Sequence, residues 1–178
     1  MELTFDQAKP EEAQILCDLI NRAYRGESSK VGWTTEADLL GGQRTDKAAI
    51  EDLIKSKNKV ILNTYTNKKL IGCVLLEKKT ETLAYLGMLT VEPGLQDKGI
   101  GRKILENSEH FVVKNWNCIE LEMTVIPIRT ELIDWYKRRG YLVTGEKRPF
   151  PATDPRFGIP KRNDLNFVVL SKTLGKKA

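Results

Sequence analysis

Apolar positions along the chain follow two periods, and the two periods alternate. Four stretches carry apolar residues three and four positions apart, the spacing of a helix that packs one face on a core. The first begins at Pro10, and the second is capped by Asp46. The third covers about residues 99–113, and the fourth is capped by Thr130 and ended by Gly140. The pattern therefore predicts four helices.

Shorter apolar runs between these helices predict strands. Residues 83–91 are apolar at nearly every position, as in a strand buried on both faces. Residues 118–126 alternate, which places Glu120, Glu122 and Thr124 on one face. The order of strands and helices is that of an α/β fold. The remaining strands are predicted at 3–5, 60–66, 70–77, 141–144 and 165–170.

Two long stretches show neither period. Residues 27–45 are polar and contain glycine, and residues 148–162 are rich in proline. The first is too long to serve only as a connection in a chain of 178 residues. We expect them to form irregular walls beside a site.

The junction between the strand at 83–91 and the helix at 99–113 carries the candidate chemistry. A helix start offers unpaired backbone N–H groups and the positive end of the helix dipole, and Gly99 and Gly101 leave room for an anion. The turn therefore predicts a phosphate-binding site. Its sequence is Thr90-Val91-Glu92-Pro93-Gly94-Leu95-Gln96-Asp97-Lys98-Gly99-Ile100-Gly101-Arg102.

Two common phosphate-binding loops do not fit this turn. A P-loop requires lysine and then serine or threonine after Gly99, where the chain has Ile100 and Gly101. A dinucleotide-binding turn requires G-x-G-x-x-G, with an acidic residue about 20 positions later. The pattern present is Q-x-x-G-x-G, formed by Gln96, Gly99 and Gly101.

This turn resembles the pyrophosphate-binding turn of the GNAT superfamily of acetyl-CoA-dependent N-acetyltransferases. A second signature of that family resembles the later run Trp135-Tyr136-Lys137-Arg138-Arg139-Gly140-Tyr141. The resemblance covers nearly the whole chain, most clearly from about residue 83 to 141. It implies a GNAT-like α/β fold in which residues 1–174 form a single domain. Its mixed, mostly antiparallel, splayed central sheet is flanked by about four helices, and residues 175–178 are a short basic tail.

The resemblance also implies that acetyl-CoA is the acetyl donor, without a metal. Backbone N–H groups of the turn then hold the pyrophosphate, and the end of the preceding strand pairs with the pantetheine arm. For that arm to lie beside the strand the sheet must open, and Gly87 suits a bulge or bend there. Arg129 stands where the family commonly has an asparagine. The implied coenzyme-binding residues are Leu89, Thr90, Val91, Gln96, Asp97, Lys98, Gly99, Ile100, Gly101, Arg102, Arg129 and Tyr136.

Acetyl transfer to an amine needs an oxyanion donor and an acid for the departing thiolate. By resemblance, the backbone N–H of Leu89 is the donor and the hydroxyl of Tyr136 is the acid. Tyr136 could instead only complete the apolar stripe of its helix with Leu132 and Trp135.

The base that receives the amine's proton is less directly indicated. One family glutamate aligns with Tyr85 and another with Thr124, so neither is present here. Glu122 and then Glu120 share the face of Thr124 and are the candidates. The alternative for both is a structural ion pair.

Acceptor recognition is expected from the two walls and the adjoining strand. A loop of mixed charge is equally often a solvated lid, so these residues do not choose among acceptors. The acceptor is a primary amine of a small molecule, an amino acid or a peptide. The candidate acceptor-binding residues are Tyr24, Trp33, Glu36, Arg44 and Tyr85.

Composition limits the kinds of molecule that the chain is expected to bind. The net charge is +5, but Lys and Arg are interleaved with acids, which favours a solvated surface over nucleic-acid binding. No run approaches the ~20 apolar residues of a membrane span, and the N-terminus lacks signal-peptide features. We expect a cytoplasmic monomer or homodimer with no membrane partner. Cys17, Cys73, Cys118 and the single His110 are too scattered for a metal site.

Two other functions fit the same residues. One is a catalytically silent acyl-CoA sensor or adaptor, and the other is a transferase for a different acyl-CoA. Release of free thiol across a panel of amines separates the sensor from an enzyme.

Overall fold

A computed structural model describes residues 1–151 and 154–175. Apart from Gly175, the basic tail expected at 175–178 lies outside these residues.

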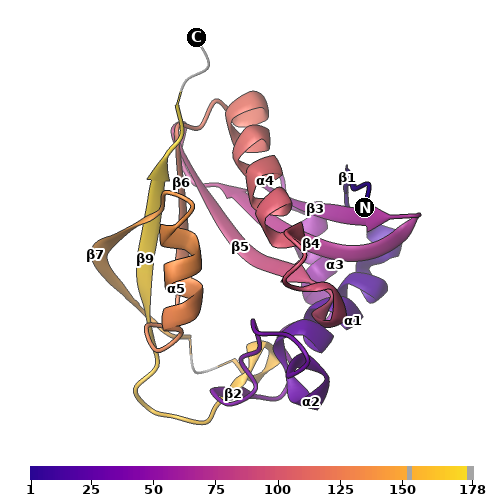
Figure 1. The fold of residues 1–178 in the computed structure, drawn as a ribbon, viewed down its shortest axis with the longest axis vertical. Helices are drawn as coiled ribbons and strands as arrows, with labels where there is room; N and C mark the ends of the chain where they lie inside the picture. Colours follow the sequence, from indigo (N-terminus) through magenta and orange to yellow (C-terminus); the bar gives the residue numbers. More distant parts are fainter. Residues whose placement is uncertain (152–153, 176–178) are drawn as a thin grey trace.

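A seven-stranded sheet forms the centre of the molecule, in the order β1-β3-β4-β5-β6-β9-β7 (Figure 1). All neighbouring strands are antiparallel except β5 and β6, which are parallel. The mixed, mostly antiparallel sheet expected from the sequence is therefore confirmed. Its strands are β1 (Thr4–Gln7), β3 (Lys59–Thr66), β4 (Lys69–Lys78), β5 (Leu83–Val91), β6 (Glu120–Val125), β7 (Leu142–Pro149) and β9 (Asn166–Thr173).

Four helices cover the sheet, and a fifth, short one lies beside its open end. Figure 1 shows α4 and α5 on one face and α1 and α3 on the other. Each pair of helices packs on its own hydrophobic cluster, because successive side chains of the central strands point to opposite faces. The helices are α1 (Ala13–Tyr24), α2 (Gly26–Ser29), α3 (Lys47–Lys55), α4 (Ile100–Trp116) and α5 (Thr130–Lys137).

The sheet opens between its two parallel strands. β5 and β6 pair only along Leu83–Tyr85 and Glu120–Glu122, so the second halves of both strands have no ladder between them. The cause is a bulge in β5. Between the pairs Cys73–Thr90 and Leu75–Gly87, β4 contributes one residue and β5 contributes two. The bulge expected near Gly87 is therefore present, directly after it.

The bulge has a defined backbone geometry. Met88 has φ +49°, an uncommon conformation for a residue with a side chain. The hydroxyl of Thr90 donates a hydrogen bond of 2.8 Å to the carbonyl oxygen of Met88, and Thr90 is buried. That bond holds the distorted segment in place, so the opening is a built feature of the sheet.

Several local expectations need correction. Thr130 does not cap α5, since the capping position is Arg129 and makes no side-chain capping bond. β5 is not buried on both faces, because its side chains alternate between buried and partly exposed positions. Asp46 does cap α3, accepting a hydrogen bond of 2.7 Å from the backbone of Ala49.

The two irregular walls touch each other. β2 (Leu40–Gly41) in the first wall pairs antiparallel with β8 (Ile159–Pro160) in the second. They are joined below the opening of the sheet, where Figure 1 shows β2 and α2. A two-residue pairing leaves no periodic signal, so the sequence could not predict it.

Within the described ranges no helix is long and apolar enough to cross a bilayer. The three cysteines are buried and unpaired.

Candidate active site

The turn between β5 and α4 presents unpaired backbone donors. Asp97 and Gly99 have φ +63° and +75°, which curls the chain so that successive amides lie at the helix start. In the described part of the chain, none of the backbone N–H groups from Asp97 to Arg102 donates to a protein acceptor. α4 is 17 residues long, and its dipole adds partial positive charge here. The turn is therefore suited to bind a phosphate.

Gln96 supports the turn through hydrogen bonds of its side chain. Its Oε1 accepts hydrogen bonds of 2.9 and 3.4 Å from the backbone N–H groups of Trp33 and Thr34. Its Nε2 donates to the hydroxyl of Thr34 at 2.8 Å and to the carbonyl oxygen of Val91 at 3.3 Å. These bonds attach the first wall to the turn. The side chain of Gln96 thus has a structural role, while the expectation for this residue concerned its backbone N–H.

Gly32 leaves room for the side chain of Gln96 that attaches the first wall to the turn. The sequence analysis did not identify this residue. A Cβ at this position would lie 2.5 Å from Oε1 of Gln96. Only a glycine lets the amide of Gln96 come this close. No local sequence pattern indicates this role of Gly32, because the residue it contacts, Gln96, is 64 positions away.

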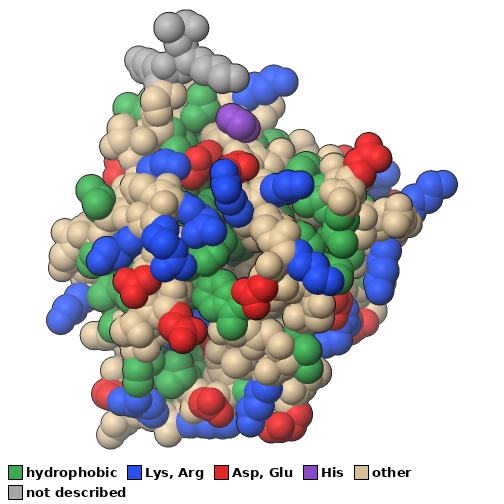
Figure 2. Space-filling model, viewed as in Figure 1, with side chains coloured by type: hydrophobic (Ala, Val, Ile, Leu, Met, Phe, Trp, Pro, Cys, Tyr) green, Lys and Arg blue, Asp and Glu red, His purple; other side chains and the backbone are tan. Residues whose placement is uncertain are grey.

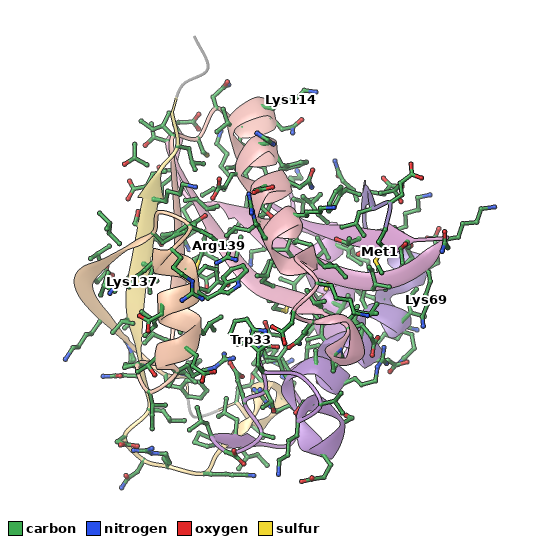
Figure 3. All side chains as sticks on the ribbon, viewed as in Figure 1. Met1, Trp33, Lys69, Lys114, Lys137 and Arg139 are labelled. Carbon is green, nitrogen blue, oxygen red and sulfur yellow. The ribbon has the colours of Figure 1, made fainter. Side chains whose placement is uncertain are left out.

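A pocket of about 240 Å³ lies beside the turn, and we call it the turn pocket. The Trp33 and Trp135 rings lie 6.2 Å apart on its wall, and the guanidinium of Arg139 stacks 3.7 Å from the Trp135 ring (Figure 3). The turn pocket is lined by Tyr24, Trp33, Thr34, Leu89, Val91, Gln96, Asp97, Gly99, Gly101, Arg102, Arg129, Leu132, Trp135, Tyr136 and Arg139.

A second pocket of about 190 Å³, the wall pocket, lies between the splayed strands and the two walls. Its lining combines guanidinium groups with apolar and aromatic side chains. The lining residues are Tyr24, Arg25, Glu36, Leu40, Arg44, Tyr85, Leu86, Gly87, Met88, Leu89, Met123, Thr124, Val125, Arg129, Leu132, Tyr136, Phe150, Pro151, Phe157 and Phe167.

The two pockets meet at a shared set of side chains. Five residues line both: Tyr24, Leu89, Arg129, Leu132 and Tyr136. The two pockets therefore adjoin at these side chains, which we call the junction. The junction lies at the end of the opening between β5 and β6, so the bulge in β5 creates it.

Tyr136 faces the junction from α5 and is almost fully buried. Its ring packs edge-on against those of Trp135 and Tyr141, at centroid distances of 5.0 and 5.8 Å. Burial raises the pKa of Tyr136, and the positive charges of Arg129 and Arg139 offset part of that rise. The hydroxyl therefore stays protonated at neutral pH.

Tyr24 faces the junction from the end of α1. Its hydroxyl donates to the carbonyl oxygen of Leu89, at the bulge. Burial, and then the charge of Glu36, raises the pKa of Tyr24 to about 12. Tyr24 therefore fixes the backbone at Leu89 and remains neutral.

Glu36 connects the two walls to α5 through two arginines. Its carboxylate pairs with Arg25, which is 4% exposed, and with Arg129, at 3.0 Å. Arg129 also donates to the carbonyl oxygen of Thr34 at 2.6 Å, and Arg25 donates to that of Phe157 at 3.1 Å. The residue that replaces the family's asparagine thus holds the first wall over the junction.

The two candidate bases lie outside both pockets. Both oxygens of Glu122 accept hydrogen bonds from the guanidinium of Arg148, at 3.0 and 3.2 Å. Glu120 is exposed and accepts a hydrogen bond from Ser171. Glu122 thus forms the structural ion pair that was the alternative to a role as base. Glu120 forms no ion pair among the described residues, and its place outside both pockets does not favour a role as base.

The other candidate residues divide between the pockets. Trp33, expected to bind the acceptor, lines the turn pocket instead. Glu36, Arg44 and Tyr85 line the wall pocket, where the hydroxyl of Tyr85 hydrogen-bonds that of Thr124 at 2.9 Å. Besides the two glutamates, the candidate residues that line neither pocket are Thr90, Lys98 and Ile100.

Basic side chains gather beside the turn pocket. Arg102, Arg138, Arg139 and Lys172 line an adjoining hollow that also contains Glu106 and Glu109. Figure 2 shows Lys and Arg side chains clustered near the middle of this face. The local charge favours an anion that extends beyond the turn.

Comparison with protein families gives one match. The profile of the acetyltransferase (GNAT) family covers residues 14–141, which run from the second residue of α1 to just past the end of α5 and include the turn. No curated protein sequence matches the chain.

Solved structures share the fold at low sequence identity. An N-acetyltransferase from Staphylococcus aureus Mu50 superposes with a TM-score of 0.71 at 14% identity, over 97% of this chain and 98% of that one. The ribosomal-protein-S18-alanine N-acetyltransferase from Escherichia coli gives 0.71 at 13%, over 99% and 97%. A GNAT family acetyltransferase from Elizabethkingia anophelis with acetyl-CoA bound gives 0.61 at 16%, over 97% and 98%.

The contact between Gly32 and Gln96 predicts a non-additive pair of substitutions. Gln96→Ala should lower the free energy of unfolding by about 1–3 kcal/mol, because it removes the side chain that joins the wall to the turn. Gly32→Ala should cost a similar amount, because the new Cβ displaces the amide of Gln96. The double variant should cost about as much as one single variant in urea denaturation. Costs that add would contradict the contact.

The raised pKa of Tyr24 predicts a loss of stability at alkaline pH. Since the folded state holds the proton more tightly than the unfolded chain, this contribution is complete below about pH 10 and is lost as pH rises toward about 12. The free energy of unfolding, measured by urea denaturation, should fall less steeply with pH across this window in Tyr24→Phe than in wild type. The two slopes should differ by up to about 1.4 kcal/mol per pH unit. Ile50→Val, a buried change without a titrating group, should lower stability and keep the wild-type slope. Parallel curves for wild type and Tyr24→Phe would refute this assignment.

Proposed function

The chain belongs to the GNAT family of acetyltransferases, and from that premise we propose that it moves the acetyl group of acetyl-CoA to a primary amine. Transfer occurs by direct attack of the amine in a ternary complex. The observation that carries this proposal is the junction, where Tyr24, Leu89, Arg129, Leu132 and Tyr136 line both pockets. A donor in one pocket and an acceptor in the other can react only where the pockets meet.

The turn pocket is proposed to hold the donor. The unpaired amides of Asp97 to Arg102 suit the pyrophosphate, and the basic hollow beside them suits the remaining phosphate. Leu89 and Val91 line the route from the turn to the junction, which suits the pantetheine arm. When bound there, acetyl-CoA supplies an activated thioester.

Two groups of the junction are proposed to act on the thioester. The backbone N–H of Leu89 donates to the carbonyl oxygen of the thioester as negative charge develops on it. The hydroxyl of Thr90 binds the carbonyl oxygen of the same peptide unit, that of Met88, and Tyr24 binds the next carbonyl oxygen, that of Leu89. The hydroxyl of Tyr136 donates its proton to the sulfur as the C–S bond breaks. The raised pKa of Tyr136 makes it a weaker acid than free phenol. The same burial destabilises the thiolate, which favours the transfer.

Proton balance does not require a dedicated carboxylate. The acceptor's ammonium group first releases one proton to solvent, which gives the neutral amine that attacks. This nitrogen then loses one further proton as the amide bond forms, and the sulfur gains one. Within the described lining of the wall pocket, Glu36 is the one carboxylate, and two arginines bind it. We therefore propose that the amine's proton returns to Tyr136 through water, so that one hydroxyl serves both transfers.

Tyr136→Phe tests the acid. Turnover, measured as release of free thiol from acetyl-CoA with an amine acceptor, should fall at least tenfold, since the variant loses the proton donor. Affinity for coenzyme A should stay nearly unchanged, because the ring remains.

Tyr141→Phe is the matched control. The ring of Tyr141 packs against that of Tyr136, but the hydroxyl of Tyr141 donates a hydrogen bond to Glu109. Tyr141 lines neither pocket. This variant should keep its turnover. Wild-type turnover in Tyr136→Phe would remove Tyr136 as the acid. Coenzyme binding without thiol release for any amine would favour an acyl-CoA sensor over an enzyme.

A further inference from the structure

We infer that the acceptor amine carries a carboxylate, and that Arg44 binds this carboxylate in the wall pocket while the amine faces Tyr136. The inference rests on the proposed function, since it names the acceptor class of the same site. The remainder of the acceptor is apolar, so the class is that of amino acids with apolar side chains.

Charge in the wall pocket is the first observation. Three guanidinium groups line it, from Arg25, Arg44 and Arg129, and they face a single carboxylate, that of Glu36. The lining therefore carries an excess of positive charge in a partly enclosed space. Such a site attracts an anionic group and repels a polyamine, whose other amines are cationic.

Two of the three arginines are already engaged. Arg25 and Arg129 share the carboxylate of Glu36, and each also donates to a backbone carbonyl of a wall. Glu36 therefore compensates one of these two positive charges, and the donors of both arginines are used to hold the walls.

Arg44 has no such partner. Over the described residues its guanidinium forms no ion pair, and its nearest recorded interaction is with the Tyr24 ring, 5.8 Å from the centroid. Its backbone is nonetheless fixed, because the N–H groups of Arg44 and Thr45 donate to Asn21 Oδ1 at 2.6 and 3.1 Å. A positioned, half-buried guanidinium without a carboxylate is a ready site for a bidentate contact to one.

Aromatic side chains also line the wall pocket. They are those of Phe150, Phe157 and Phe167, and the Phe150 and Phe167 rings lie 5.3 Å apart. An acceptor whose carboxylate is bound by Arg44 therefore finds apolar surface for its remainder in the same pocket. The pocket, at about 190 Å³, suits a compound of amino-acid size.

Matched acceptors test the carboxylate. Thiol release from acetyl-CoA is measured with L-phenylalanine, L-leucine and L-methionine, with the amide of each, and with spermidine. The readout is the ratio of kcat/KM for each acid to that for its amide. The amines of acid and amide differ in basicity, but that difference is the same for every enzyme variant, so ratios are compared between variants.

Arg44→Gln should lower this ratio at least tenfold relative to wild type, and Arg44→Lys should keep part of it. Arg22→Gln is the control, because Arg22 pairs with Glu92 on the surface and lines neither pocket. It should keep the wild-type ratio. Since Arg44 does not line the turn pocket, coenzyme A should raise the Tm of every variant equally, which also verifies folding.

The outcomes separate the two proposals. An equal acid-to-amide ratio in wild type and Arg44→Gln, or a wild-type preference for amides or spermidine, overturns the carboxylate inference and leaves the N-acetyltransferase intact. If no amine releases thiol, the proposed function fails. The carboxylate contact is then judged by binding alone: L-phenylalanine should raise the Tm of the coenzyme-bound wild type and not that of Arg44→Gln, and no difference overturns it.

Discussion

The bulge in β5 is the feature on which the rest of the site depends. A continuous ladder between β5 and β6 would fill the space where two ligands can meet, and the register shift at Met88 ends that ladder after Tyr85. The distortion is stabilised locally by the hydroxyl of Thr90 and from outside by the hydroxyl of Tyr24. The opening is held by hydrogen bonds within the protein itself, which is what preorganisation for catalysis requires.

The walls are attached to this opening by polar contacts over long sequence separations. Gln96 joins the first wall to the turn, and Glu36 joins it to α1 and α5 through two arginines. Because these two arginines bind Glu36, no carboxylate of the described lining is left to pair with Arg44, and its positive charge is uncompensated. Structural and recognition roles are therefore linked: the groups that close the site also determine the charge that an acceptor meets.

The sequence predicted the features that have a local pattern. β5 was expected over residues 83–91 and occupies Leu83–Val91, and the order of the main elements was correct. Tyr136 was expected at the site from a run of seven residues and lies at the junction. The contacts of Glu36 with Arg129 and of Gly32 with Gln96 could not be predicted, because the partners are 93 and 64 positions apart and neither residue lies in a periodic segment. Glu122 was a candidate base because it shares a strand face with Thr124. Its hydrogen bond with Arg148 could not be predicted, because it depends on where β7 lies in the sheet.

The central claim is that donor and acceptor meet in the opening between β5 and β6. A crystal structure with coenzyme A tests it most directly. The account predicts the pyrophosphate within hydrogen-bond distance, about 3 Å, of backbone nitrogens between Asp97 and Arg102, with the thiol beside the hydroxyl of Tyr136. Coenzyme bound away from the turn, or a thiol directed away from Tyr136, would contradict it.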